Sequence, residues 1–236
     1  MYKDKNILCT ICARGGSKGV NKKNISLINR KPLIAYSIES AIKSQAFEEV
    51  VVSTDCDEIM NASKKFGAKV FFQRPENLSL DSTPKLPVIK HAFISSEKYF
   101  KKKFDVLVDL DATSPLRKTE DILNCIDLLI KNNHSNIITA TPSRRSPYFN
   151  IVEKDFNGFW NVSKKNPTET ISRRQDSPKC FDMNASIYVW NRNSILNNES
   201  VFQEKTGLYV MPEERSIDID SPLDFKLVSF LLQENN

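Results

Sequence analysis

The sequence predicts a three-layer α/β/α fold around a mostly parallel β-sheet, with a small β-rich arm inserted late in the chain. Through the first 141 residues, short runs rich in Val, Ile and Leu alternate with segments whose apolar residues recur every three or four positions. This alternation is typical of parallel strands joined by right-handed helical crossovers. A length of 236 residues fits one good-sized domain. The stretch 142–180 is rich in Pro, Ser, Arg and Asn, so we expect a core of residues 1–141 plus 181–236 and an arm at 142–180.

The first half of the chain follows the strand–helix order closely. Pro32 suits the first turn of a helix, because proline lacks the N–H that a first turn leaves unbonded. Gly67 suits the end of a helix, where a left-handed residue is common. The expected elements are a strand at 7–13, a helix at 33–42, a strand at 49–53, a helix at 57–66 and a strand at 68–72.

The second half keeps this order up to the arm and returns to it afterwards. Thr119 is placed to cap a helix, since its hydroxyl can accept a hydrogen bond from the first turn. The expected elements are a helix at 87–99, a strand at 104–110, a helix at 119–129, strands at 136–141, 184–190 and 208–211, and a helix at 221–232. Within the arm, only short β-like pieces are expected, at 150–153 and 158–162.

Composition excludes several function classes. No run approaches the roughly 20 apolar residues of a membrane span, and the polar start MYKDKN is unlike a signal peptide, so we expect a cytoplasmic protein without a membrane partner. The five cysteines are expected to be reduced, and Cys9 and Cys12 lie three apart on a strand, facing opposite sides. With two histidines in the chain, a His-based metal site is disfavoured. The net charge of +5 is modest and shows no basic–aromatic stripe, which argues against nucleic acid.

The stretch around which the chain is organised is a basic, glycine-rich turn after the first strand. Gly15, Gly16 and Gly19 let the backbone approach a ligand closely, and four cations surround them, at Arg14, Lys18, Lys22 and Lys23. The spacing matches neither a P-loop nor a dinucleotide fingerprint. The turn therefore predicts a polyphosphate cradle of another kind.

A second candidate site lies near the other end of the chain. Asp218 and Asp220 share one face of an extended segment, because residues two apart on a strand point the same way. Paired carboxylates suit a Mg2+ ion that also contacts phosphate oxygens. Asp109 and Asp111 form a rival D-x-D pair, which is the pattern of glycosyltransferases that use nucleotide sugars.

Taken together, the motifs resemble those of the CMP-sialic acid synthetases, also called acylneuraminate cytidylyltransferases. The matching segments cover nearly the whole chain in the same order: ARGGSKG at 13–19 with Lys23-Asn24, STD at 53–55, RP at 74–75, ATSPLR at 112–117, NASIY at 184–188 and SIDIDSPLD at 216–224. The resemblance implies a Rossmann-like nucleotidyltransferase sheet, CTP as a substrate, Mg2+ as cofactor and a homodimer in which the arm reaches the partner's sugar pocket.

The resemblance also implies roles for individual residues. Catalytic roles fall on Arg14, Lys23 and Asp220, and the metal ligands are Asp218 and Asp220. The nucleotide would contact Ala13, Arg14, Gly15, Lys23, Asn24, Arg74, Lys85 and Asp111. The sugar acid would contact Arg174, Tyr188, Phe181 and Phe149. Lys18 and Lys22 match less specifically and are expected to be solvated.

Three positions depart from the sialic acid pattern. Asp111 stands where many members carry a glutamine, and Lys85 stands where some carry a small hydroxyl residue. Phe149 stands where a lysine is expected, which resembles the branch that acts on legionaminic acid, and a less polar pocket suits that deoxygenated, more acylated sugar. At position 111 an aspartate can accept a hydrogen bond from the cytosine amino group, but it cannot donate one to the ring carbonyl.

The expected activity is transfer of CMP from CTP to the C2 hydroxyl of a nine-carbon nonulosonic acid, legionaminic or N-acetylneuraminic acid, with release of pyrophosphate. CMP-Kdo synthesis, which uses an eight-carbon acid, is the alternative within the same chemistry. A D-x-D glycosyltransferase and a non-catalytic nucleotide sensor are the alternatives outside it. No side chain stands out as a general base.

Overall fold

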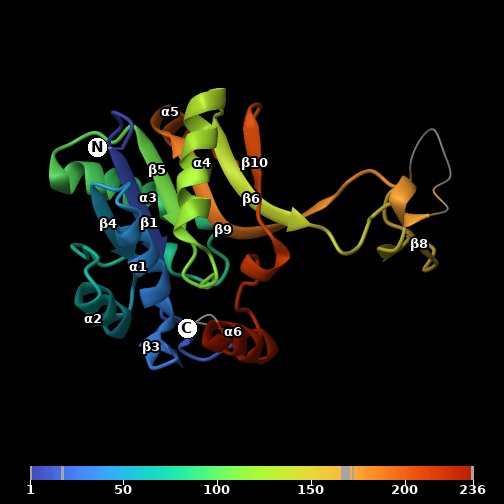
Figure 1. Ribbon diagram of the computed structural model, residues 1–236, viewed down its shortest axis with the longest axis horizontal. Helices are drawn as coiled ribbons and strands as arrows, with labels where there is room; N and C mark the ends of the chain where they lie inside the picture. The colour runs from blue at the N-terminus through green and yellow to red at the C-terminus, as the bar shows by residue number, and fades with distance from the viewer. Residues whose placement is uncertain (1, 17–18, 166–170, 172, 235–236) are drawn as a thin grey trace.

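Six strands form the central sheet, in the spatial order β10-β6-β9-β5-β1-β4. The computed structural model describes residues 2–16, 19–165, 171 and 173–234 (Figure 1). Lys18, one of the four cations of the basic turn, lies outside the described residues. The strands of the sheet are β1 (Ile7–Cys12), β4 (Glu49–Ser53), β5 (Val106–Leu110), β6 (Asn136–Pro142), β9 (Phe181–Asn191) and β10 (Thr206–Val210).

The sheet is mostly parallel, as the sequence predicts. β1 pairs in parallel with β4 and β5, and β10 pairs in parallel with β6. β9 is the exception, because it runs antiparallel to both β5 and β6. The chain leaves the sheet at the end of β6, passes through the arm and returns beside β6, so β9 enters from the opposite end.

Helices cover both faces of the sheet. On one face, α1 (Leu33–Ser44), α2 (Asp57–Lys65) and α4 (Thr119–Asn132) bury an apolar side against β1, β4, β5 and β9. On the other face, α3 (Lys85–Phe100) and α5 (Arg192–Asn197) pack against the opposite side chains of these strands. Alternation of side chains along each strand supplies both apolar faces. The final helix α6 (Pro222–Glu234) packs through Val228 against Ile28 and Leu33.

Several local predictions differ from the structure. The strand expected at 68–72 is reduced to a single parallel bridge between Lys69 and Val51. Helix α3 begins at Lys85, two residues before the expected start. Thr119 is the first helical residue of α4 rather than its cap, and the Asp121 carboxylate accepts a hydrogen bond from the Lys118 N–H instead, at 2.9 Å.

The arm extends away from the body at the ends of β6 and β9 (Figure 1). It contains one antiparallel hairpin, formed by β7 (Val152–Lys154) and β8 (Trp160–Val162). Much of its apolar surface is exposed, including Phe156 at 97 % and Phe159 at 70 %. Among the described residues of the arm, these large apolar side chains therefore pack little against the rest of the chain.

The remaining short elements are the strands β2 (Leu27–Ile28) and β3 (Lys31–Pro32), and the 3₁₀ turns η1 (Lys23–Ile25), η2 (Glu76–Leu78), η3 (Arg174–Asp176) and η4 (Glu213–Arg215). All five cysteines are free thiols. Among the described residues, no helix combines the length and the apolar character that crossing a bilayer requires.

Candidate active site

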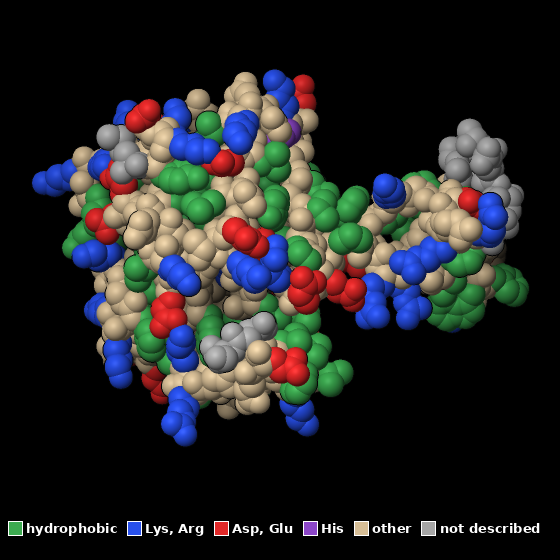
Figure 2. Space-filling model, viewed as in Figure 1, with side chains coloured by type: hydrophobic (Ala, Val, Ile, Leu, Met, Phe, Trp, Pro, Cys, Tyr) green, Lys and Arg blue, Asp and Glu red, His purple; other side chains and the backbone are tan. Residues whose placement is uncertain are grey.

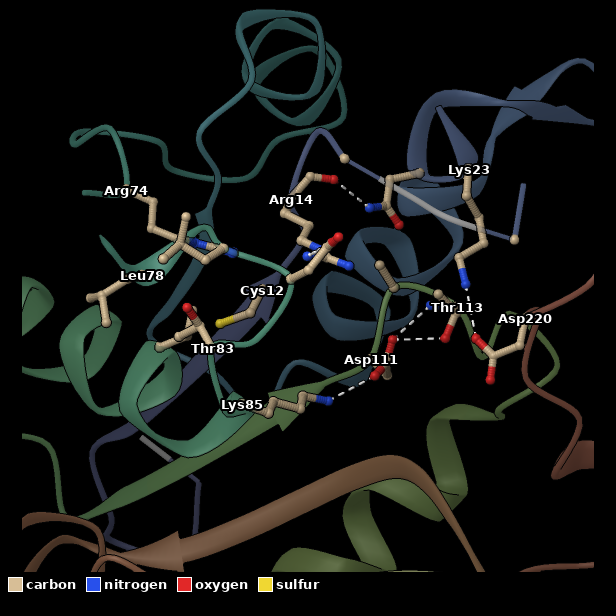
Figure 3. Close-up of a pocket in the computed structure, with 17 residues that line it drawn as sticks. Cys12, Arg14, Lys23, Arg74, Leu78, Thr83, Lys85, Asp111, Thr113 and Asp220 are labelled. Atoms are coloured by element: carbon tan, nitrogen blue, oxygen red, sulfur yellow. Dashed lines mark hydrogen bonds and ion pairs between the residues drawn. The ribbon is translucent and has the colours of Figure 1, made fainter. Parts of the chain in front are cut away.

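The carboxyl ends of β1, β4 and β5 open into a cleft of about 400 Å³ (Figure 3). Ligands of open α/β sheets bind at this edge. Seven of the predicted site residues lie together here, at Arg14, Lys23, Asn24, Arg74, Lys85, Asp111 and Asp220. The other lining residues are Cys12, Gly16, Gly19, Leu78, Leu80, Asp81, Thr83, Val88, Ala112 and Thr113.

Hydrogen bonds to residues on both sides fix the position of the basic turn. The Asp55 carboxylate accepts a hydrogen bond from the Gly15 N–H at 2.9 Å, and the Arg14 carbonyl accepts one from the Asn24 amide at 3.0 Å. The Arg14 guanidinium lies in the cleft and forms an ion pair with Asp81. Ala13 and Gly15 position the turn without lining the cleft; the Ala13 N–H donates to the Ser53 carbonyl at 3.0 Å.

The basic turn and the twin-aspartate segment meet in this cleft. The Lys23 ammonium lies 3.0 Å from an Asp220 carboxylate oxygen and also donates to the Ile219 carbonyl. Gly19 lies so close to the Asp220 carbonyl that a Cβ at position 19 would collide with it. Lys22 instead pairs with Glu58 on the exposed side of the turn, in agreement with a solvated role.

The geometry around Asp218 and Asp220 fits a divalent cation. Burial and the neighbouring Asp220 carboxyl raise the pKa of Asp218 to about 6. Like charges held this close favour a shared proton or a bound cation. The backbone here is fixed, because the Asp224 carboxylate accepts hydrogen bonds from the Asp220 N–H at 3.1 Å and the Ser221 N–H at 2.7 Å. Asp220 lines the cleft, whereas Asp218 is not among its lining residues. Carboxylate oxygens are ligands that Mg2+ prefers.

Lys85 occupies the floor of the cleft between two carboxylates. Its ammonium lies 2.7 Å from an Asp111 oxygen and 3.3 Å from an Asp109 oxygen, and 4.9 Å from the centre of the Tyr188 ring. Burial alone would lower the pKa of Lys85 and raise that of Asp111, but their attraction reverses both shifts, so the pair is ionised. The second Asp111 oxygen accepts hydrogen bonds from the Thr113 N–H and hydroxyl.

The hydrogen bonds within the Lys85–Asp111 pair determine which donors and acceptors remain for a ligand. Both Asp111 oxygens already accept hydrogen bonds, from Lys85 and from Thr113. An ammonium has three N–H donors, and only two face these carboxylates. Lys85 therefore has a donor to offer to a ligand, and the Asp111 Oδ2, which accepts from Lys85, has a second lone pair. That Asp111 accepts a hydrogen bond from the cytosine amino group stays a prediction.

The D-x-D alternative is not supported by the geometry. Asp109 has no solvent exposure, and its Oδ1 accepts a hydrogen bond from the Thr10 hydroxyl at 2.8 Å. Asp109 does not line the cleft, and the Lys85 ammonium lies between its carboxylate and that of Asp111. Among the described residues, no group of three or more His, Cys, Asp or Glu side chains has the geometry of a protein-only metal site.

Arg74 lines the cleft, and hydrogen bonds to residues at the end of β4 hold both its side chain and its backbone. Its side chain is 6 % exposed, its Nε donates to the Ser53 hydroxyl at 3.1 Å, and its backbone N–H donates to the Thr54 carbonyl at 2.8 Å. Figure 3 shows Arg74 and Leu78 at the end of the cleft opposite Lys23 and Asp220.

The predicted sugar residues are not part of this cleft. Arg174 and Phe181 line a separate pocket of about 600 Å³ where the arm joins the body, and Phe149 lies in the arm. Tyr188 does not line this cleft either, and its predicted contact with the sugar acid stays a prediction. It is 5 % exposed and stacks on Trp190 with ring centres 5.4 Å apart, because β9 lies between β5 and β6 under α3.

Sequence reasoning missed the residues that support the site from behind. Arg117 is 5 % exposed and donates to the Ser186 carbonyl at 3.0 Å, the Ser37 hydroxyl at 2.8 Å and the Asp111 carbonyl at 2.7 Å. These bonds fix the loop that carries Asp111 and Thr113. Arg117 ends the ATSPLR segment, but nothing in its spacing indicates that its partners are backbone carbonyls.

Three comparisons extend these observations. Residues 8–234 match the family described as Cytidylyltransferase. A Campylobacter jejuni protein named CMP-N,N'-diacetyllegionaminic acid synthase is 51 % identical over 230 residues, which cover 98 % of this chain and 96 % of that one. Post-translational flagellin modification protein B of Campylobacter coli is 48 % identical with the same coverage. A solved structure of CMP:2-keto-3-deoxy-manno-octonic acid synthetase complexed with CTP is 18 % identical, has a TM-score of 0.72 and covers 98 % of this chain and 100 % of that one.

Proposed function

Because the chain belongs to the cytidylyltransferase family, we propose that it transfers CMP from CTP to the C2 hydroxyl of a nonulosonic acid and releases pyrophosphate. The observation that carries this proposal is the contact between Lys23 and Asp220 in the cleft that also holds Arg14. Segments almost 200 residues apart thereby combine two cations and a carboxylate at the end of a parallel sheet. That combination suits a metal-bound triphosphate.

N,N'-diacetyllegionaminic acid is the acceptor that we propose. The support is the relative of that name, which is 51 % identical over 98 % of this chain, and Phe149 at the position where a lysine is typical of the sialic acid branch. N-acetylneuraminic acid and the eight-carbon acid Kdo are the competing acceptors. The likeness to a Kdo-activating enzyme is at 18 % identity and concerns the fold alone.

We propose Mg2+ as the cofactor, held by Asp218 and Asp220 together with phosphate oxygens of CTP. Bound there, the ion would neutralise charge on the phosphates and increase the acidity of the attacking hydroxyl. The support from this chain is the close pair of carboxylates and the raised pKa of Asp218.

The chain's own cations have distinct parts in the proposed reaction. The Arg14 guanidinium is a fork that suits two phosphate oxygens, while Lys23 is a movable point charge whose reach includes Asp220. Both would stabilise charge that develops on the leaving pyrophosphate. Asn24 would act indirectly, since its amide holds the Arg14 carbonyl. Positioning and charge neutralisation would supply most of the rate.

We further propose a homodimer in which the arm of one protomer completes the sugar site of the other. Arg174, Phe181 and Phe149 lie on or beside the arm, away from the nucleotide cleft of their own chain. Figure 2 shows apolar side chains gathered on the outer part of the arm, with basic side chains next to them. A reaction that consumes CTP also suits the cytoplasm, which is the compartment that we propose.

A pyrophosphate-release assay with CTP, Mg2+ and a panel of acceptors tests the function. We expect turnover with N,N'-diacetyllegionaminic acid, a lower kcat/KM with N-acetylneuraminic acid and the lowest with Kdo. Asp220→Asn and Arg14→Met should each lower the rate by about 10²–10³-fold. CTP binding without turnover on any acceptor would contradict the proposed transfer, and a preference for Kdo would contradict the proposed acceptor.

A further inference from the structure

A buried ion pair lies directly before the twin-aspartate segment, outside the cleft. The Arg215 Nη2 donates to an Asp121 carboxylate oxygen at 2.8 Å, and the Arg215 Nη1 lies 3.3 Å from a Glu120 oxygen. The Asp121 side chain is fully buried, and that of Arg215 is 15 % exposed. Asp121 belongs to the first turn of α4, whereas Arg215 ends the 3₁₀ turn η4.

The ion pair joins the start of α4 to the end of η4, which leads directly into the twin-aspartate segment. Asp121 already accepts a hydrogen bond from the Lys118 N–H, and the Tyr209 hydroxyl donates to it at 3.2 Å. Contacts from the start of α4 and from β10 therefore hold the Asp121 carboxylate in addition to its ion pair with Arg215. A three-residue 3₁₀ turn has little stability of its own, so its position depends on such contacts.

Two further contacts hold the segment after Arg215. The Asn184 amide donates to the Ser216 hydroxyl at 3.0 Å, and the Ile219 N–H donates to the Thr113 carbonyl at 3.0 Å. The Ile219 side chain is fully buried in the cluster that contains Val228. Asp218 lies between these contacts and Asp220 directly after them, so the position of both carboxylates follows from the placement of the whole segment.

We propose that Arg215 is a positioning residue for the metal–nucleotide site: its ion pair with Asp121 fixes the segment that carries Asp218 and brings Asp220 to the cleft. This inference rests on the proposed function, because it assumes that these aspartates hold the cation. Arg215 does not itself line the cleft, and its guanidinium faces Asp121 and Glu120. Burying an ion pair costs desolvation free energy, which can exceed the attraction between the two charges. A role in fixing one conformation would explain why this pair is present.

Arg192 provides a matched control. Its guanidinium makes a two-bond ion pair with Glu97, at 2.8 and 2.9 Å, in which the arginine side chain is 30 % exposed and the carboxylate 14 %. It lies at the other end of β5, where its backbone N–H donates to the Asp105 carbonyl. Loss of this pair should lower stability without affecting the cleft.

The experiment compares Arg215→Gln, Arg215→Lys and Arg192→Gln in the full chain. Binding of Mn2+, which takes the same oxygen ligands as Mg2+ and is visible by EPR, is titrated in the presence of CTP. We expect Arg215→Gln to weaken Mn2+ binding by about 10-fold, in the range typical of residues that support metal ligands. Arg215→Lys should recover part of the loss, since an ammonium can reach Asp121 but not both acids, and Arg192→Gln should bind like the unaltered chain.

Amide hydrogen exchange provides a second readout that involves neither metal nor substrate. The peptide that contains Ile219 should exchange faster in Arg215→Gln than in Arg192→Gln when the two variants have equal melting temperatures. If exchange and Mn2+ affinity are the same in both variants, Arg215 has a merely structural role and the inference is wrong.

Asp220→Asn distinguishes this failure from failure of the proposed function. If Asp220→Asn weakens Mn2+ binding and Arg215→Gln does not, the metal site stands and only the positioning role is overturned. If Asp220→Asn leaves Mn2+ affinity unchanged, the twin aspartates do not hold the metal and both proposals fall.

Discussion

At the residue scale, the site depends on close approach as much as on charge. Gly19 is a residue whose missing side chain matters, because its Cα faces the Asp220 carbonyl at a distance that excludes a Cβ. Gly16 lines the same cleft with open space around the equivalent position. The two glycines of one turn therefore differ in what they contribute.

We predict that Gly19→Ala lowers kcat/KM for CTP by about 10²-fold, because the basic turn must move away from the twin-aspartate segment. Gly16→Ala is the matched control and should change the rate little, since its methyl group meets no atom within 4 Å. Steady-state kinetics with CTP as the varied substrate measure both. Equal effects of the two substitutions would show that the approach of Gly19 to Asp220 is unimportant.

The ionised Lys85–Asp111 pair makes stability depend on pH. Attraction to Lys85 and hydrogen bonds from Thr113 overcome the effect of burial and hold the pKa of Asp111 well below its usual range. Its unfolded pKa is about 3.9. A depressed folded pKa means that the unfolded chain binds the proton more readily, so the contribution of Asp111 is complete above pH 4 and is lost as the pH falls further.

We therefore predict that the free energy of unfolding of the unaltered chain falls more steeply below pH 4 than that of Asp111→Asn. Urea denaturation at a series of pH values between 2.5 and 7 measures the difference. Asp4→Asn, which removes an exposed carboxylate at the amino end of β1, serves as the control and should follow the unaltered chain. Parallel curves for Asp111→Asn and the unaltered chain would mean that the pair does not stabilise the fold.

At the element scale, the β7–β8 hairpin exposes large apolar side chains, which the packing of a single chain does not account for. Trp160 is 67 % exposed and Phe159 is 70 % exposed, although both side chains are large and apolar. Large exposed apolar patches mark interaction sites in proteins that remain soluble. A second copy of the chain is the occupant that the proposed homodimer supplies.

We predict that the double substitution Phe159→Glu and Trp160→Glu converts a dimer into a monomer and lowers activity with the sugar acid. Sedimentation velocity at micromolar concentration measures the first effect, and kinetics with varied acceptor measure the second. Phe202→Glu is the control, because Phe202 is also 66 % exposed but lies outside the arm. If the unaltered chain sediments as a monomer, the arm has another role.

At the scale of the whole molecule, the sheet topology brings distant segments to one edge. β1, β4 and β5 are neighbours in parallel, so the loops that follow them, which carry Arg14, Asp55 and Asp111, emerge side by side. The segment after β10 crosses to this edge before α6 begins, and the Ile219 N–H bonds to Thr113 there. The cleft is a property of strand order rather than of any one motif.

We predict that chelation with EDTA abolishes turnover but leaves the melting temperature unchanged. The proposed metal ligand Asp220 has a side chain that is 74 % exposed, and the core beneath it is apolar and complete without an ion. Scanning calorimetry and the pyrophosphate assay, each with and without EDTA and then with excess Mg2+, separate the two effects. Full activity in EDTA would remove Mg2+ from the mechanism.

Local sequence determined most of the elements, because strand and helix periodicities are properties of short segments. The strands at β1, β4 and β5, the break at Gly67 and the change of texture at the arm all follow from such patterns. The strand expected at 68–72 failed, because a strand needs a partner along its length and only Lys69 pairs with β4. The motif match likewise assigned Arg14, Lys23 and Asp220 to one site, and all three residues line the cleft.

Only the tertiary structure decided which side chains face a ligand and which face one another. It buried Tyr188 beneath Lys85, gave both oxygens of Asp111 hydrogen-bond partners, and directed Arg117 and Arg215 toward partners within the chain rather than into the cleft. These outcomes depend on contacts between residues far apart in the sequence, such as Arg215 and Asp121, which are 94 positions apart. A sequence pattern carries the chemical type of a residue, but its partners are chosen by packing across the whole sheet.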